Sequence, residues 1–205
     1  MNREDQAKWD RIYASNQHGF FPPALVLRMQ SHLLPFRGTA LDLACGLGRN
    51  AVFLCQHGLS TSAWDISGEA IRRLDEYASA EGLAITTEVR DVSTQPPEPD
   101  SFDVIVVSHF LERTIMPALG QALTPGGLLF YQTFTRLKVT DTGPENPDYL
   151  LEENELLETF AGLELLFYCD NRDVGDTGQG LRNEAMIVVR KKSSQETEVR
   201  KQETK

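Results

Sequence analysis

The chain has 205 residues, of which 40% are hydrophobic, and 20 Lys plus Arg stand against 30 Asp plus Glu, giving a formal net charge of −10. This size and composition favour one domain with a core of its own, and the negative charge argues against a nucleic-acid partner because no basic patch offsets it. A membrane span needs roughly 18 consecutive apolar residues, which the sequence lacks, and the charged start MNREDQAKWDR is unlike a secretory signal, so we expect a cytoplasmic protein.

The elements predicted in chain order are two helical segments followed by alternating strands and helices. The helical segments cover residues 3–15 and 23–34, and strand-like runs follow at 39–44, 60–65, 84–89, 102–108 and 127–134. Helical patterns, or a proline-rich turn at 96–99, separate these runs, which predicts a parallel sheet with helices on both faces.

The end of the chain differs from this alternation. Strand-like runs at 163–169 and 184–191 are joined by a glycine-rich polar loop, which favours an antiparallel hairpin over a crossover. We therefore expect a helical cap at residues 1–38, a core at 39–191, and a disordered charged tail at 192–205.

The segment Ala40–Ala51, ALDLACGLGRNA, predicts a strand, a tight glycine turn and a helix. A P-loop would need Lys followed by Ser or Thr at the helix start, where Arg49 and Asn50 stand, so that class of site is excluded. Gly46, Gly48 and Ala51 do satisfy the dinucleotide pattern GxGxx[GA]. Glycine spacing alone therefore leaves a nicotinamide cofactor and S-adenosylmethionine (SAM) both open.

Charge distinguishes these two cofactors. Asp42 should lie at the carboxyl end of the first strand, where an unpaired carboxylate would repel a pyrophosphate. SAM carries no phosphate, and its ammonium and sulfonium groups are cations that Asp42 would attract, directly or through water. Asp42 therefore favours SAM.

Two further acids end strand-like runs. Asp65 could accept hydrogen bonds from the ribose hydroxyls while Ile66 contacts the adenine, and Asp91, followed by Val92, could accept from the adenine amino group. Each acid alone could equally cap a helix or a turn. Because ligands of open α/β sheets bind at the carboxyl ends of the strands, the series of acids indicates one crevice.

Candidates for the methyl-acceptor side follow the fourth and fifth strands. A general base is not obligatory for methyl transfer, because positioning alone can supply much of the rate and a soft anionic acceptor would need none, and the sequence identifies no definite catalytic residue. His109, Arg113 and Arg136 are the candidates, each with an ordinary structural alternative. Trp9 and Tyr13, four residues apart on the first helix, could close over the cofactor or simply pack on the sheet.

The three cysteines, Cys45, Cys55 and Cys169, are odd in number and lack the paired spacing of a metal site. We expect free thiols, no disulfide and no metal.

Several motifs together carry a family resemblance: WDRIY, LDLACGLGRN, WDIS, RDVS, FDVIVVSHFLER, LTPGGLLFYQTFT and GPENPDYLLEENELLETF. The chain resembles class I SAM-dependent methyltransferases and, more loosely, their tellurite-resistance methyltransferase family. One departure is that Ala44 and Asn50 flank only two glycines, where that superfamily often has three.

The resemblance implies a Rossmann-like, mostly parallel seven-stranded sheet with an antiparallel last strand. It implies SAM as cofactor and a small-molecule methyl acceptor, such as a tellurite or selenite oxyanion or a thiol. The residues expected to bind SAM are Trp9, Tyr13, Asp42, Ala44, Gly46, Gly48, Asn50, Asp65, Ile66, Asp91, Val92 and Ser108. A nicotinamide oxidoreductase and a SAM-binding protein without turnover remain as alternatives, and the sequence does not indicate an oligomeric state.

Overall fold

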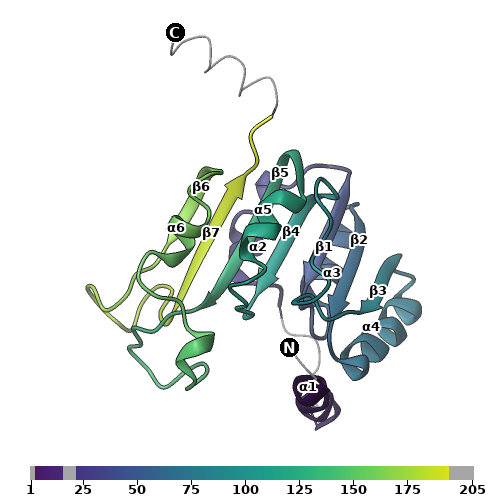
Figure 1. Ribbon diagram of the computed structural model, residues 1–205, viewed down its shortest axis with the longest axis horizontal. Helices are drawn as coiled ribbons and strands as arrows, with labels where there is room; N and C mark the ends of the chain where they lie inside the picture. Colours follow the sequence, from purple (N-terminus) through teal and green to yellow (C-terminus); the bar gives the residue numbers. More distant parts are fainter. Residues whose placement is uncertain (1–2, 16–21, 194–205) are drawn as a thin grey trace.

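Seven strands form one sheet in the computed structural model, which describes residues 3–15 and 22–193. The strands lie in the order β3-β2-β1-β4-β5-β7-β6, which can be followed from one edge of the sheet to the other in Figure 1. Their bounds are β1 Thr39–Leu43, β2 Ser60–Asp65, β3 Ile85–Val89, β4 Phe102–Ser108, β5 Leu123–Phe134, β6 Glu164–Cys169 and β7 Glu184–Arg190.

The strands from β1 to β5 pair in parallel, whereas β7 pairs antiparallel with both β5 and β6. The predicted fold, a mostly parallel seven-stranded sheet ending in an antiparallel strand, is therefore confirmed. The last strand does not extend the sheet at its edge. It inserts between β5 and β6, which places the start of β7 beside the carboxyl end of β5: Glu184 is the partner of Phe134.

Helices cover both faces of the sheet, as predicted. α2 (Leu25–Met29), α3 (Arg49–Gln56) and α4 (Gly68–Glu81) pack on one face, and α5 (Met116–Ala122) and α6 (Glu155–Thr159) pack on the other. Side chains alternate between the two faces along β4. Val104 and Val106 belong to the core beneath α2 and α3, whereas Ile105 and Val107 belong to the core beneath α5 and α6. Among the described residues, no helix is both long and apolar enough to cross a bilayer.

The helix expected at 23–34 is shorter than predicted. α2 ends at Met29, a 3₁₀ turn covers Ser31–Leu33, and Leu34 has extended backbone. Pro35 follows, and a proline disfavours helical backbone in the residue before it. The linker 16–21 and residues 194–205 of the expected tail lie outside the described residues.

α1 (Arg3–Ser15) lies beyond the carboxyl ends of the parallel strands, next to β1 and β2 (Figure 1). It packs mainly against α4 and covers neither face of the sheet. The helix is polar overall, so its place depends on the specific contacts described below.

Candidate functional site

The topology itself indicates where a ligand would bind. From β1 the chain runs outward through β2 to β3, and then returns to place β4 on the other side of β1. In open α/β sheets, the carboxyl ends of the two strands at such a switch point border a crevice. Asp42, Asp65 and Ser108, near the ends of β1, β2 and β4, all lie at this end of the sheet. A separate cavity of about 880 Å³ lies at the amino ends, lined in part by Gly38, Asp103 and Gly127.

The glycine loop between β1 and α3 has left-handed backbone at Ala44, Gly46 and Gly48, with φ of 54°, 53° and 75°. A Cβ on Gly48 would lie 2.4 Å from the Leu74 side chain, so this glycine allows α3 and α4 to pack closely. A Cβ on Gly46 would lie 2.7 Å from the Tyr13 hydroxyl. Gly46 therefore allows the Tyr13 side chain of α1 to approach the loop closely.

Asp42 is fully buried and holds the first turn of α3. Its Oδ2 accepts a hydrogen bond from the Ala51 amide at 2.9 Å, and its Oδ1 accepts from Asn50 Nδ2 at 3.1 Å. Asn50 Nδ2 also donates to Ser108 Oγ at 3.0 Å, so three residues predicted to bind the cofactor lie together. Burial raises the pKa of Asp42 to about 7, although the hydrogen bonds from Asn50 and Ala51 oppose the shift.

Asp65 joins the end of β2 to the glycine loop. Its Oδ2 accepts from the Gly46 amide and its Oδ1 from the Ser67 amide, each at 2.8 Å. Burial raises the pKa of Asp65, and these backbone hydrogen bonds favour the ionised form in opposition. Ile66, the next residue, is partly exposed at the crevice end of β2.

Asp91 and Val92 lie in the turn after β3. Asp91 Oδ1 accepts from the Ser93 amide at 3.0 Å and from the Ser93 hydroxyl at 2.6 Å, so this oxygen closes its own turn. Val92 is buried in the core that includes Trp64. The turn is fixed to β2, since the Arg90 amide donates to the Asp65 carbonyl at 2.8 Å.

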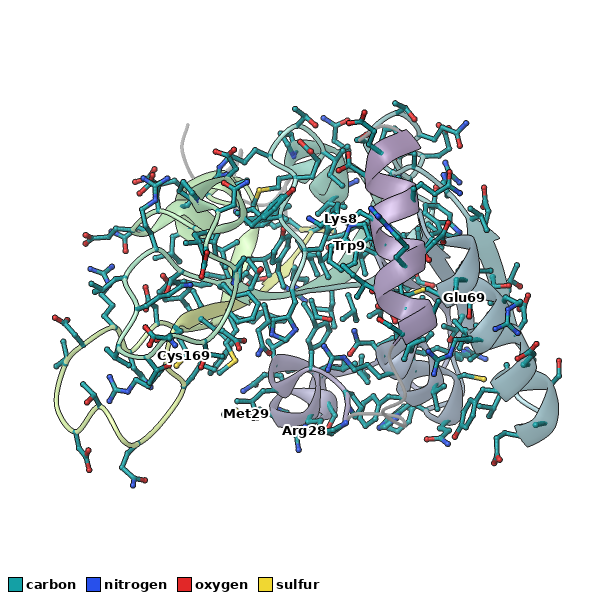
Figure 2. The ribbon with its side chains drawn as sticks, turned by 90° about the horizontal axis from the view of Figure 1, so that it is seen from below. Lys8, Trp9, Arg28, Met29, Glu69 and Cys169 are labelled. Carbon is teal, nitrogen blue, oxygen red and sulfur yellow. The ribbon has the colours of Figure 1, made fainter. Side chains whose placement is uncertain are left out.

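α1 is fastened across this end of the sheet. Asp10 Oδ1 accepts from the Ser67 hydroxyl at 2.6 Å and from the Glu69 amide at 3.1 Å, and Arg73 donates to the Tyr13 carbonyl at 2.6 Å. Figure 2, which looks onto α1, shows the helix crossing in front of the strand ends, with Trp9 on it and Glu69 beside it.

Two aromatic side chains on α1 stack over the crevice. The rings of Trp9 and Tyr13 have centroids 5.9 Å apart, and the Tyr13 hydroxyl lies over Gly46. Burial raises the pKa of Tyr13 above its usual range, so the hydroxyl keeps its proton. Lys8 Nζ lies 5.6 Å from the ring of Tyr149, which connects α1 to the long loop after β5. α1 thus bridges both sides of the crevice.

His109, just after β4, belongs to a row of hydrogen-bonded side chains formed by Arg49, His109, Glu184 and Gln132. Its Nδ1 lies 3.0 Å from an Arg49 guanidinium nitrogen, and its Nε2 lies 3.1 Å from Glu184 Oε2. Gln132 Nε2 donates to the same Glu184 oxygen at 2.5 Å, and Gln132 Oε1 accepts from the Val26 amide at 2.8 Å. Glu184 is not among the site residues predicted from the sequence. Its only local signal is an acid at the start of β7, ahead of five apolar residues.

Arg113 and Arg136 fasten the loop that follows β5. Arg113 pairs with both carboxylate oxygens of Glu155, at 2.6 and 2.9 Å, and donates to the Asp148 and Leu150 carbonyls. Arg136 forms an ion pair of 2.6 Å with Glu152, with about half of each side chain exposed. Both arginines therefore pair with residues of the segment 148–155.

Cys45 is buried in the glycine loop, Cys55 and Cys169 are partly buried, and all three are free. Burial raises the pKa of Cys45 well above its ordinary value, so this thiol stays protonated.

Part of the chain is similar in sequence to known methyltransferases. Residues 40–127 match a family model described as a methyltransferase domain. Over 140 residues the chain is 31% identical to a probable SAM-dependent methyltransferase, TehB, of Haemophilus influenzae, which covers 64% of this chain and 48% of that protein. The chain thus spans about half the length of the curated relatives it matches.

Solved structures share the whole fold. The crystal structure of Haemophilus influenzae TehB matches with a TM-score of 0.68 and 25% identity, covering 90% of this chain and 67% of that chain. A SAM-dependent methyltransferase from Methanosarcina mazei matches with a TM-score of 0.65 and 18% identity over 85% of this chain and all of that chain, which shows the fold alone.

The sequence match includes β1, the glycine loop and the end of β2, where the Gly46 amide contacts Asp65, and the structural match to TehB covers 90% of this chain. Residues 40–127 therefore match the methyltransferase domain family, and the described chain has the methyltransferase fold.

Proposed function

We propose that this chain binds SAM in the crevice beyond β1, β2 and β4 and transfers its methyl group to a small-molecule acceptor. The observation that carries the proposal is the contact between Asp65 and the Gly46 amide. It joins the acid at the end of β2 to a glycine turn that the Tyr13 side chain approaches closely, within the segment that matches the methyltransferase model.

The residues present fit this cofactor. A carboxylate has about four lone-pair positions, and the hydrogen bonds from the Gly46 and Ser67 amides leave acceptor capacity on Asp65 for the ribose hydroxyls. Ile66 offers an apolar contact for the adenine. Asp42 lies behind the loop, where its negative charge would favour the cationic methionine end across Asn50.

SAM supplies an electrophilic methyl group on a cationic sulfur, and the protein's main task is to align an acceptor with it. Such positioning alone contributes effective molarities of roughly 10⁵–10⁸ M. Since α1 and the loop after β5 are joined by Lys8 and Tyr149, they would close the crevice and exclude water.

Binding of S-adenosylhomocysteine, the demethylated product, tests the cofactor assignment. The product should raise the melting temperature in a concentration-dependent manner, because a ligand that binds only the folded state stabilises it. NAD should cause no shift. If S-adenosylhomocysteine fails to bind, the proposal is wrong.

Turnover separates an enzyme from a SAM-binding protein without activity. Tellurite, selenite, thiols and small carboxylates should be screened for release of S-adenosylhomocysteine. The resemblance of the sequence motifs to the tellurite-resistance methyltransferase family supports the tellurite and selenite oxyanions and the thiols as first candidates. Binding without turnover on every acceptor would favour the non-catalytic alternative.

A further inference from the structure

We propose that His109 is the general base that takes a proton from the methyl acceptor, and that Glu184 is a positioning residue that fixes the histidine's orientation and tautomer. The inference rests on the proposed function. It goes further by naming the acceptor class: a nucleophile that carries its own ionisable proton, such as a thiol or a phenol.

The contacts of the imidazole determine its tautomer. A guanidinium can only donate, so His109 Nδ1, which faces Arg49, must present its lone pair. An ionised carboxylate can only accept, so Nε2, which faces Glu184, must carry the hydrogen. Burial opposes ionisation of Glu184, but hydrogen bonds from His109 and Gln132 outweigh it and hold the pKa of Glu184 below its ordinary value.

The ring is held in place from several elements. Its backbone has φ of 54°, a left-handed conformation that is uncommon for residues other than glycine, and the His109 amide donates to the Gln132 carbonyl at 2.8 Å. The Phe134 ring packs on the imidazole with centroids 4.8 Å apart. Strained backbone that neighbouring contacts fix in this way recurs at functional sites.

The row is anchored at its far end as well. Gln132, which donates to Glu184, is itself fixed by the Val26 amide. The carboxylate therefore has little freedom to rotate, and it can stabilise an imidazolium when His109 gains a proton. A carboxylate that orients a histidine in this manner is the arrangement on which histidine bases generally depend.

The lone pair faces Arg49, a residue that adjoins the proposed cofactor site. Arg49 is the first residue of α3, directly after the glycine loop, and Ser108, the neighbour of His109, is bonded to Asn50 of the same helix turn. The His109 side chain is 28% exposed, so a small acceptor can reach it. An acceptor that hydrogen-bonds to Nδ1 would replace Arg49 there, and the displaced guanidinium would remain near the developing negative charge.

The proposed proton transfer begins at the acceptor. The S–H or O–H bond of the acceptor breaks, and its proton forms a bond to His109 Nδ1. The electron pair stays on the acceptor atom and forms the bond to the methyl carbon, while the former carbon–sulfur pair stays on the donor sulfur. The imidazolium, still bonded to Glu184 through Nε2–H, then releases the Nδ1 proton to solvent. No oxidant, reductant or other reactant is needed.

The first test is spectroscopic and does not depend on activity. Long-range ¹H–¹⁵N spectra of the histidine-labelled chain at about pH 8, where a histidine of ordinary pKa is neutral, should show His109 as the Nε2–H tautomer. The chain has four histidines, and loss of one signal set in His109→Asn assigns it. His57 is an internal control with the opposite tautomer, because its Nδ1 lies 2.9 Å from the Phe53 carbonyl, which only accepts.

Glu184→Gln completes this test. Arg49 still donates to Nδ1 in this variant, so the Nε2–H tautomer should persist, but the Nε2–H proton resonance should move upfield because its acceptor is no longer a charged carboxylate. A wild-type His109 in the Nδ1–H form, or an Nε2–H proton resonance unchanged by Glu184→Gln, would overturn the positioning role.

The second test compares acceptors that share an attacking atom and differ in acidity. The thiol pair is 2-mercaptoethanol, protonated at neutral pH, and 4-nitrothiophenol, already ionised; phenol and 4-nitrophenol form the oxygen pair. His109→Asn should lower kcat/KM for the protonated member of a pair by roughly 10²–10⁴-fold, the usual contribution of a positioned base. The loss with the acidic member should be at least tenfold smaller. Asn is chosen because it tolerates left-handed backbone.

Controls distinguish this inference from the function it rests on. His57→Asn, a matched substitution outside the row, should leave all rates unchanged, and Glu184→Gln should reproduce part of the acidity-dependent loss. Equal losses with both members of a pair, or no turnover of any of the four acceptors by a chain that binds S-adenosylhomocysteine, would overturn the general base. Failure to bind S-adenosylhomocysteine would instead refute the proposed function.

Discussion

At the residue scale, the two buried carboxylates at the crevice, Asp42 and Asp65, bind different parts of the segment that runs from the glycine loop into α3. Asp42 faces inward and holds α3 through Ala51 and Asn50, while Asp65 contacts the backbone of the glycine loop itself. Both have raised pKa values because burial disfavours their charge. Their ionisation should therefore be coupled to a cationic ligand, which compensates the buried negative charge.

Replacement of Asp65 should weaken cofactor binding. Asp65→Ala removes two potential hydrogen bonds between a charged acceptor and the ribose, so the Kd of S-adenosylhomocysteine should rise roughly 10- to 100-fold in calorimetric titrations. Asp173→Ala, which removes an exposed acid from the loop between β6 and β7, is the matched control and should bind normally. Unchanged affinity in Asp65→Ala would refute the ribose role.

Asp42 should make binding depend on pH. Its folded pKa of about 7 exceeds the ordinary 3.8, so the folded state holds the proton more tightly, and the stability from this group is lost as pH rises from about 4 to 7. A ligand with a cationic ammonium group favours the ionised form. Its affinity should therefore rise by up to about tenfold per pH unit below pH 7, with release of up to one proton.

Calorimetry in buffers of different ionisation enthalpy measures that proton. Asp42→Asn should flatten the pH dependence, and wild-type affinity that does not vary between about pH 6 and 8 would contradict the coupling.

At the element scale, α1 is connected to the cofactor-binding residues through a short chain of polar contacts. Asp65 accepts from the Ser67 amide, Ser67 caps α4 by accepting from the Ala70 amide, and the Ser67 hydroxyl donates to Asp10 on α1. The position of the helix that carries Tyr13 is thus tied to the acid that would hold the ribose.

Detachment of α1 should therefore weaken cofactor binding. Asp10→Ala removes the two hydrogen bonds to the start of α4, each worth about 0.5–1.5 kcal/mol, so S-adenosylhomocysteine should bind about tenfold more weakly. Hydrogen exchange should become faster across residues 3–15. Arg11→Ala changes an exposed side chain on the same helix and is the control; rapid exchange with unaltered affinity would mean that α1 is not part of the binding site.

At the scale of the whole molecule, the order of the strands brings the two halves of the site together. β4 lies beside β1, which places His109 close to the glycine loop, and β7 lies between β5 and β6, which places Glu184 near His109. A single sheet therefore carries the proposed cofactor side on β1 and β2 and the proposed acceptor side on β4, β5 and β7.

The long loop after β5 should contribute to global stability through Arg113. This side chain joins the turn before α5 to Glu155 and to two loop carbonyls, so Arg113→Ala should reduce the free energy of unfolding by about 1–3 kcal/mol. Urea denaturation measures the change. Arg136→Ala, which breaks a largely exposed ion pair, should cost less than about 1 kcal/mol; equal effects would contradict the difference drawn between the two arginines.

Local patterns account for the parts of this protein that could be predicted. Apolar periodicity located the strands and α1, and the glycines with Asp42 and Asp65 indicated the cofactor site, because strand ends and tight turns have sequence signals of short range. The early end of α2 also has a local signal, Pro35, which disfavours helical backbone in the residue before it.

The sequence by itself determined the fold class and the expected methyl donor, since both depend on alternating strands and helices and on residues close along the chain. Only the tertiary structure decided which side chains meet at the acceptor side. His109 and Glu184 are 75 residues apart, and their contact exists because β7 inserts between β5 and β6. Strand order depends on how distant apolar faces pack, and no spacing within the sequence records it.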